Sequence, residues 1–245
     1  MLKLNKRYRS EYDNETIVIE RVYEAGQWHS TTETVPNSVA NNQISDQAVV
    51  YGNGLSRLPF NTDLITHHKG GLLGAKTLQT YGCNAIYRDI KVDFLVSTDR
   101  PITAEIASSG YYKENIVYTR VQNTLEFPKL FYLIPNDVYA DAGTTAIYIA
   151  AFDGHKKIFL LGFDGQDTPG FNHNVYAGTN AYDAKNATIE DEKWILNRTE
   201  VFSVYDDVDF VLVTETGRAL IPEAWKYLTN VRQISFRNFI TEASL

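Results

Sequence analysis

Apolar residues gather in short continuous runs from about residue 46 onward, and these runs predict the strands of a buried sheet. Residues 48–51 lead into Gly52, and residues 157–161 lead into Gly162. Runs that are apolar on both faces are typical of parallel strands with helices on either side. We therefore predict an α/β fold with a twisted, mostly parallel sheet of about six or seven strands. The strand ranges are 48–51, 78–81, 92–96, 116–118, 130–134, 157–161 and 210–213.

Two segments between these runs have helical patterns. Residues 142–152 follow Asp141, a good N-cap, and stop before Gly154, which suits a C-terminal turn. Further along, Thr188 and Asp191 have the spacing of a capping box. The residues that share one face of this second helix are Trp194, Arg198, Val201 and Tyr205.

Residues 1–45 have a different pattern. Residues 16–23 alternate with the two-residue period of a strand, residues 25–26 supply a turn, and residues 27–32 return as a second strand. A polar, turn-rich linker follows. We predict a β-hairpin arm and linker over residues 1–45, joined to one nucleotide-binding α/β domain over residues 46–245, and the arm offers a surface for homo-oligomerisation.

Composition excludes several classes of protein. The chain has 245 residues, of which 44% are hydrophobic, and this content is too high for a disordered protein. No apolar run approaches the length of a transmembrane segment. Cys83 is the single cysteine, so an internal disulfide is excluded and a reducing, cytoplasmic setting is expected. The net charge of -7, with scattered lysines and arginines, argues against nucleic acid as a partner.

Small and polar residues end four of the predicted strands. In open α/β sheets, ligands bind beyond the carboxyl ends of the strands, so we expect these four ends to converge. They are residues 52–56, Asn84, residues 99–100 and residues 162–164. The Gly-Asn-Gly turn is an incomplete dinucleotide fingerprint, because Arg57 occupies the place of the third glycine. This departure argues against an NAD enzyme.

The order of these motifs resembles the bacterial sialyltransferases that use CMP-sialic acid, within a broader group that includes archaeal hydroxymethylpterin diphosphokinases. The resemblance covers residues 48–165 in spaced blocks, with the same Gly-Asn-Gly turn, strand-end asparagine, small-residue helix start and final Gly-x-Asp. The blocks are residues 51–56, 83–88, 141–145 and 157–164.

The resemblance implies a nucleotide site and a transferase activity. The cytidine monophosphate part of a CMP-sugar donor is then held by Gly52, Asn53, Gly54, Ser56 and Asn84. Backbone N–H groups of a glycine turn are suited to phosphate oxygens, and an asparagine amide is suited to ribose or base. For Asn84, an Asx turn at the strand end is an equal alternative. The implied reaction is sugar transfer to a glycan or small-molecule acceptor, without a metal or other cofactor.

Three positions depart from the sialyltransferase pattern. Ala142 stands in place of a serine, Gln166 in place of a tyrosine, and Asp99 in place of an asparagine. A carboxylate at position 99 suits a divalent cation. The alternatives are therefore a diphosphokinase-like phosphotransferase that holds magnesium through Asp99 or Asp164, or a non-catalytic interaction protein that keeps the fold.

The start of the helix at Ala142 is a second candidate for phosphate binding. Its first turn exposes N–H groups and a partial positive charge, and Gly143 lacks a side chain that would block a close approach. Thr144 and Thr145 offer hydroxyl donors. The alternative is that these small residues allow tight packing of the helix on the sheet.

The segment over residues 164–178 is polar and glycine-rich, and it directly follows a strand end. Such segments are commonly lids or specificity loops. His173 and Tyr176 are its acid/base candidates, and we expect His173 to take the proton of the acceptor hydroxyl. A solvated loop histidine is the alternative.

Overall fold

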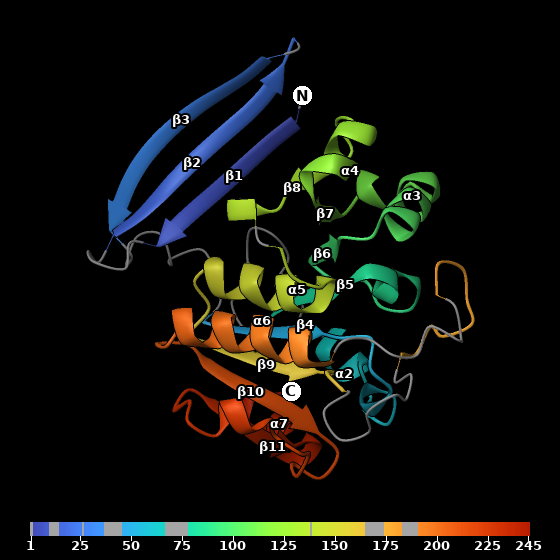
Figure 1. Ribbon diagram of the computed structural model, residues 1–245, viewed down its shortest axis with the longest axis vertical. Helices are drawn as coiled ribbons and strands as arrows, with labels where there is room; N and C mark the ends of the chain where they lie inside the picture. Colours follow the sequence, from blue (N-terminus) through green and yellow to red (C-terminus); the bar gives the residue numbers. More distant parts are fainter. Residues whose placement is uncertain are drawn as a thin grey trace.

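The computed structural model describes residues 2–9, 15–25, 27–36, 46–66, 78–137, 139–164, 174–182 and 191–245. Two sheets are present, one of three antiparallel strands and one of eight parallel strands (Figure 1). Every strand pair of the larger sheet is parallel, and helices pack on it. The predicted α/β class is therefore confirmed.

The larger sheet has the order β11-β10-β9-β4-β5-β6-β7-β8. Its strands are β4 (Gln47–Tyr51), β5 (Gln79–Cys83), β6 (Phe94–Ser97), β7 (Ile116–Thr119), β8 (Tyr132–Leu133), β9 (Lys157–Leu161), β10 (Asp209–Thr214) and β11 (Val231–Ser235). The sequence analysis missed β11. This edge strand is mostly half-buried and mixes apolar with polar residues, so it lacks a continuous apolar run.

Helices cover both faces of this sheet. On one face, α5 and α6 pack on β4, β9 and β10 through one apolar core. A second core on the other face includes residues of α2, α3 and α7. The α-helices are α2 (Asp63–Thr66), α3 (Arg100–Ser109), α4 (Val121–Glu126), α5 (Ala142–Phe152), α6 (Asp191–Val204) and α7 (Phe236–Glu242). The 3-10 helices are η1 (Leu55–Arg57), η2 (Asn84–Arg88), η3 (Tyr111–Lys113), η4 (Pro135–Asp137) and η5 (Glu223–Trp225).

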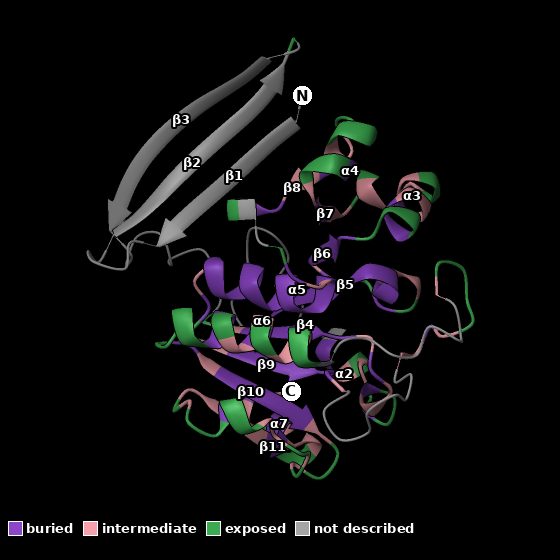
Figure 2. Cartoon of the chain, viewed as in Figure 1, coloured by how far each residue is buried: buried purple, intermediate pink, exposed green. Residues whose placement is uncertain are grey.

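Helix α5 is the central helix of its face. All of its residues are buried, whereas α6 keeps an exposed side (Figure 2). The side chain of Asp141 accepts a hydrogen bond from the backbone N–H of Thr144, so the predicted N-cap is confirmed. On α6, Arg198 and Val201 are buried as its predicted face requires, and Thr188 lies outside the described residues. Within the described residues, no helix has the length and hydrophobicity that a bilayer crossing needs.

The first strand of the large sheet lies at its centre. β4 pairs with β5 on one side and with β9 on the other. Strands β5 to β8 follow one another on one side of β4. Strands β9 to β11, which come later in the chain, follow one another on its other side. Such a reversal of strand order is where open α/β sheets place their ligands.

The N-terminal arm has one strand more than predicted. β2 (Glu15–Glu24) and β3 (Gln27–Pro36) form the expected antiparallel hairpin, and β1 (Leu2–Arg9) pairs antiparallel with β2. β1 also contacts β8 and α5 of the main domain (Figure 1). Most of the linker, residues 37–45, lies outside the described residues. The domain division at residue 45 and self-association through the arm stay predictions.

Candidate functional site

The four strand ends singled out from the sequence lie together. At the centre, the backbone N–H of Gly54 donates to the carbonyl oxygen of Gly162 at 2.9 Å. The side chain of Asn53 donates to the carbonyl oxygen of Cys83 at 3.3 Å, which joins the ends of β4 and β5. The side chain of Asn84 then donates to the carboxylate of Asp99 at 2.8 Å. We call these four ends the strand-end site.

The two glycines after β4 are required by the close approach of β9. A Cβ on Gly52 would lie 2.2 Å from the carbonyl oxygen of Gly162, and a Cβ on Gly54 would lie 2.5 Å from Cγ of Asp164. Real Cβ atoms do not approach other atoms so closely. The space into which a side chain at either glycine would extend is therefore filled by the protein itself.

The backbone donors of this turn also have protein acceptors. The N–H of Gly52 donates to Leu161 at 2.8 Å, and the N–H of Ser56 donates to the carboxylate of Asp164 at 2.7 Å. The hydroxyl of Ser56 donates to the same carboxylate. Ser56 and Asp164 thus fasten the β4 turn to the β9 turn. The N–H groups of Gly52, Gly54 and Ser56 thus already have acceptors in the protein, and nucleotide binding by this turn stays a prediction.

The start of α5 is likewise occupied by its own cap. The hydroxyl of Thr144 and its backbone N–H both donate to the carboxylate of Asp141, and the hydroxyl of Thr145 donates to the Asp141 carbonyl oxygen at 2.8 Å. A Cβ on Gly143 would lie 3.1 Å from the Asp141 carboxylate and 3.2 Å from the ring of Phe163. The alternative of tight helix packing therefore fits these three residues better than phosphate binding.

Asn84 organises the middle of the strand-end site. Its backbone lies in the left-handed region, with φ of 48°, which asparagine tolerates better than most residues. Its side-chain oxygen accepts from the backbone N–H of Thr98 at 3.3 Å, while its amide nitrogen binds Asp99. Asn84 thus joins the ends of β5 and β6 and holds the Asp99 carboxylate in an exposed position.

Two buried oxygen atoms near Asn84 have no hydrogen-bond partner among the described residues, and they are Oδ1 of Asn53 and Oγ1 of Thr98. The hydroxyl of Tyr182 is also buried there, with the side chain of Asn84 and the backbone of Ala85 as its hydrogen-bonding neighbours. Burial raises the pKa of this hydroxyl above its usual range. Buried polar atoms are nearly always hydrogen-bonded, so two unpaired oxygens in one place indicate an absent partner, either water or a ligand.

Two buried arginines lie beside the same strand ends. Arg57 donates to the hydroxyl of Tyr176 at 3.0 Å, and the guanidinium of Arg198 lies 5.1 Å from the centre of the Phe163 ring. Cys83 lies between these charges. Burial, followed by the charge of Asp141, raises the pKa of its thiol to about 12, so this cysteine stays protonated and is no nucleophile.

Tyr176 has its hydroxyl fully engaged. The hydroxyl donates to Asp89 at 2.7 Å and accepts from Arg57, and the ring lies between the guanidinium groups of Arg57 and Arg88. Burial and the bond to Asp89 raise the pKa of this hydroxyl above its usual range. This geometry favours anchoring of residues 174–182 over proton transfer. His173, the other acid/base candidate, lies outside the described residues.

Residues 174–182 are fastened to η2 and α3 by a second contact set. Arg88 binds the carboxylate of Glu105 through two bonds of 2.7 and 2.6 Å. Arg88 also donates to the hydroxyl of Thr179 and to the carbonyl oxygen of Asn180, each at 2.9 Å. We call these contacts the Arg88 clamp. They hold Tyr182 against the strand-end site.

The Arg88 clamp is expected to make the free energy of unfolding depend on pH in the acidic range. Hydrogen bonds from Arg88 lower the pKa of Glu105 from its ordinary value of 4.5 to about 2. The ionised carboxylate thus stabilises the fold above about pH 4.5, and this contribution is lost as the pH falls towards 2. We expect Glu105→Gln to cost about 1 kcal/mol at neutral pH and to match the wild type near pH 2. Urea unfolding across this range measures the difference.

The control for this experiment is Glu114→Gln, at an exposed carboxyl. Its difference from the wild type should stay small and constant over the same pH range. A Glu105→Gln difference that does not shrink in acid would show that the clamp does not depend on the charge of Glu105.

Metal ligands are not clustered in the part of the chain that the structure describes. No three His, Cys, Asp or Glu residues there lie close enough to hold a metal ion. Asp99 binds Asn84, and Asp164 binds Ser56. Magnesium binding through these carboxylates stays an untested alternative.

The sequence analysis missed Thr98, Tyr182 and Arg198 as members of the site. Thr98 directly follows β6, but the sequence analysis assigns its neighbour Asp99 to the site instead. Tyr182 and Arg198 belong to segments that are distant in the sequence from the strand ends. A local sequence pattern does not predict contacts between such distant residues. Of these three residues, only Thr98 could be predicted from the sequence, because it is a hydroxyl residue at a strand end.

Comparisons with known proteins show a weak structural likeness. No protein family and no curated protein matches the sequence. The sialyltransferase CST-II, solved with a trisaccharide acceptor and CMP, has 13% sequence identity and a TM-score of 0.38 over 68% of this chain and 80% of that one. A variant of CST-II solved with CMP has 12% identity and a TM-score of 0.40 over 81% and 98% of the two chains.

Proposed function

We propose that this protein is a nucleotide-dependent transferase, a sialyltransferase-like glycosyltransferase whose CMP-sugar donor binds at the strand-end site. The observation that carries the proposal is the presence of two unpaired buried oxygens near Asn84, Oδ1 of Asn53 and Oγ1 of Thr98. A nucleoside carries both donors and acceptors, and hydroxyls such as those of Thr98 and Tyr182 are suited to both. The preference for cytidine comes from the motif resemblance alone.

The site divides into a nucleoside part and a charged part under this proposal. Asp99 is exposed and fixed by Asn84, so its carboxylate is placed to accept bonds from ribose hydroxyls. We place the phosphate towards the buried cations Arg57 and Arg198, because several N–H groups of the glycine turn and the helix start already have protein acceptors. His173 stays the predicted general base for the acceptor hydroxyl.

Nucleotide binding by conservative variants tests the proposal. Calorimetric titration of the full chain with CMP, UMP, GMP and AMP, with and without magnesium, should show binding that prefers CMP and needs no metal. Thr98→Val deletes one unpaired oxygen and little else, and Tyr182→Phe deletes the buried hydroxyl beside Asn84. We expect each to weaken CMP binding about tenfold, as the loss of a hydrogen bond of about 1.4 kcal/mol would.

The control is Tyr111→Phe. Tyr111 also carries a buried hydroxyl, beside the backbone of Val92, but it belongs to η3, away from the strand ends. Its CMP affinity should equal that of the wild type. Equal CMP affinities in all four proteins, or no nucleotide binding at all, would remove the strand-end site from the function; binding only with magnesium would favour the phosphotransferase alternative.

A further inference from the structure

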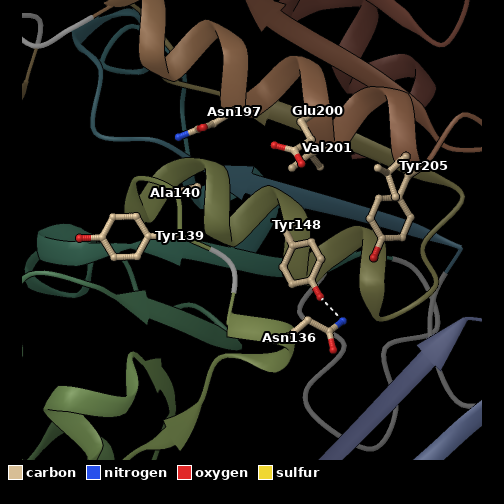
Figure 3. Close-up of a pocket in the computed structure, with 9 residues that line it drawn as sticks. Asn136, Tyr139, Ala140, Tyr148, Asn197, Glu200, Val201 and Tyr205 are labelled. Carbon is tan, nitrogen blue, oxygen red and sulfur yellow. Dashed lines mark hydrogen bonds between the residues drawn. The ribbon is translucent and has the colours of Figure 1, made fainter.

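A cavity of about 290 Å³ lies between α5, α6 and the segment over residues 136–140 (Figure 3). It is separate from the strand-end site, since none of its lining residues belongs to that site. The aromatic and polar residues that line it are Asn136, Tyr139, Tyr148, Asn197, Glu200 and Tyr205. Figure 3 shows Asn197 and Glu200 extending from α6 on one side, with Tyr148, Asn136 and Tyr139 on the other.

The aromatic wall of the cavity is held in place. The amide of Asn136 donates to the hydroxyl of Tyr148 at 2.7 Å, and the rings of Tyr148 and Tyr205 pack at 66° with centres 6.1 Å apart. Outside the lining, the guanidinium of Arg120 lies 4.5 Å from the centre of the Tyr139 ring. Arg120 also donates to the carbonyl oxygen of Ala140 at 2.6 Å. These contacts fix the cavity before any ligand arrives.

The polar groups on α6 restrict the chemistry of a ligand. The side-chain nitrogen of Asn197 is buried and has no hydrogen-bond partner among the described residues, so it needs an acceptor. Glu200 follows on the same face of α6, and its exposed carboxylate accepts hydrogen bonds. A hydroxyl group both accepts and donates, whereas an ammonium group only donates. An anionic ligand would be repelled by the Glu200 carboxylate, and the lining holds no lysine, arginine or histidine that would offset this repulsion.

We propose that this cavity binds a neutral saccharide, with its hydroxyls on Asn197 and Glu200 and its ring against the tyrosines. Ligand pockets commonly measure about 300–1,000 Å³ and combine aromatic walls with a few polar groups. A cavity at the lower end of this range suits one or two sugar rings. The proposal does not depend on nucleotide binding at the strand-end site.

Titration with named sugars tests this site. Glucose, galactose, N-acetylglucosamine and lactose are titrated separately into the full chain, followed by NMR or calorimetry, with choline and N-acetylneuraminic acid as charged comparators. We expect at least one neutral sugar to bind and both charged compounds to fail. Asn197→Asp keeps the size of the side chain but replaces its donor by an acceptor, and it should weaken binding about tenfold or more.

Two further variants keep the result interpretable. Glu200→Ala changes an exposed residue, so it should preserve the fold while also weakening the sugar about tenfold. Glu192→Gln, also exposed on α6 but outside the lining, should bind the sugar as the wild type does. The CMP affinity of all three variants should be unchanged.

Three outcomes would overturn the proposal. The first is that no neutral sugar binds the wild type, and the second is that choline binds instead. The third is that Asn197→Asp and Glu200→Ala, folded by circular dichroism, bind the sugar as tightly as the wild type does. The absence of sugar binding does not change the result expected from the CMP titration. Each of the two proposals can therefore be rejected without rejecting the other.

Discussion

Gly52→Ala is expected to lower the free energy of unfolding by about 3 kcal/mol or more, at the upper end of the cost of overpacking. The added Cβ would lie 2.2 Å from the carbonyl oxygen of Gly162 and 2.9 Å from its carbonyl carbon. Both contacts are with backbone, so no side chain can move aside to relieve them. The ends of β4 and β9 must separate instead. Urea unfolding of the two proteins measures the cost.

Gly110→Ala is the matched control, because it adds the same methyl group in open surroundings. Gly110 has φ of +75°, and the nearest atom to its added Cβ would be Lys113 Cδ at 3.7 Å. Only the left-handed backbone is then strained, at about 1–2 kcal/mol. If the two variants were equally stable, the close approach of Gly52 to Gly162 would not be a feature of the folded protein in solution.

Thr103→Val and Thr98→Val are expected to change stability in opposite directions, although the substitution is the same. The buried hydroxyl of Thr103 donates to the carbonyl oxygen of Asp99 at 2.9 Å. It also lies 2.7 Å from the hydroxyl of Ser97 and accepts from Asn123 at 3.2 Å. Valine would remove these hydrogen bonds and leave the buried Ser97 hydroxyl without its partner, at about 1–3 kcal/mol.

Thr98→Val deletes a buried hydroxyl that has no partner among the described residues. The free energy of unfolding should therefore stay unchanged or rise by about 1 kcal/mol. Thermal unfolding without ligand gives both values. A loss at Thr98 as large as that at Thr103 would mean that a bound water already satisfies the Thr98 hydroxyl, and the unpaired oxygens would no longer point to a ligand.

The sequence predicts the sheet well where its strands are buried on both faces. β4 and β9 appear as continuous apolar runs, because helices cover them on either side. β11 and β1 are edge strands with mixed sequences, and a mixed sequence does not distinguish an edge strand from a loop. The N-cap of α5 is also local in sequence, so the sequence predicts the capping role of Asp141.

The candidate site is predicted less completely, for a physical reason. Strand ends can be found from the sequence and must meet in a parallel sheet, so Asn53, Asn84 and Asp99 were found. Which donors remain available depends on contacts between distant residues. The Ser56–Asp164 pair crosses from β4 to β9, and this contact is what occupies the turn. Tyr182 reaches the site because contacts of Arg88 and Tyr176 with distant residues hold its segment.

The central position of β4 also determines when the fold can be completed during synthesis. Ala48 pairs with Ile158, and β5, β6, β7 and β8 all lie between them in the chain. Until β9 leaves the ribosome, one edge of the buried strand β4 has no neighbour, and an open apolar edge is a template for aggregation. Such distant pairings also slow folding. The strand contact that brings Gly52 against Gly162 therefore makes the nascent chain dependent on protection until about the first two thirds of it have emerged.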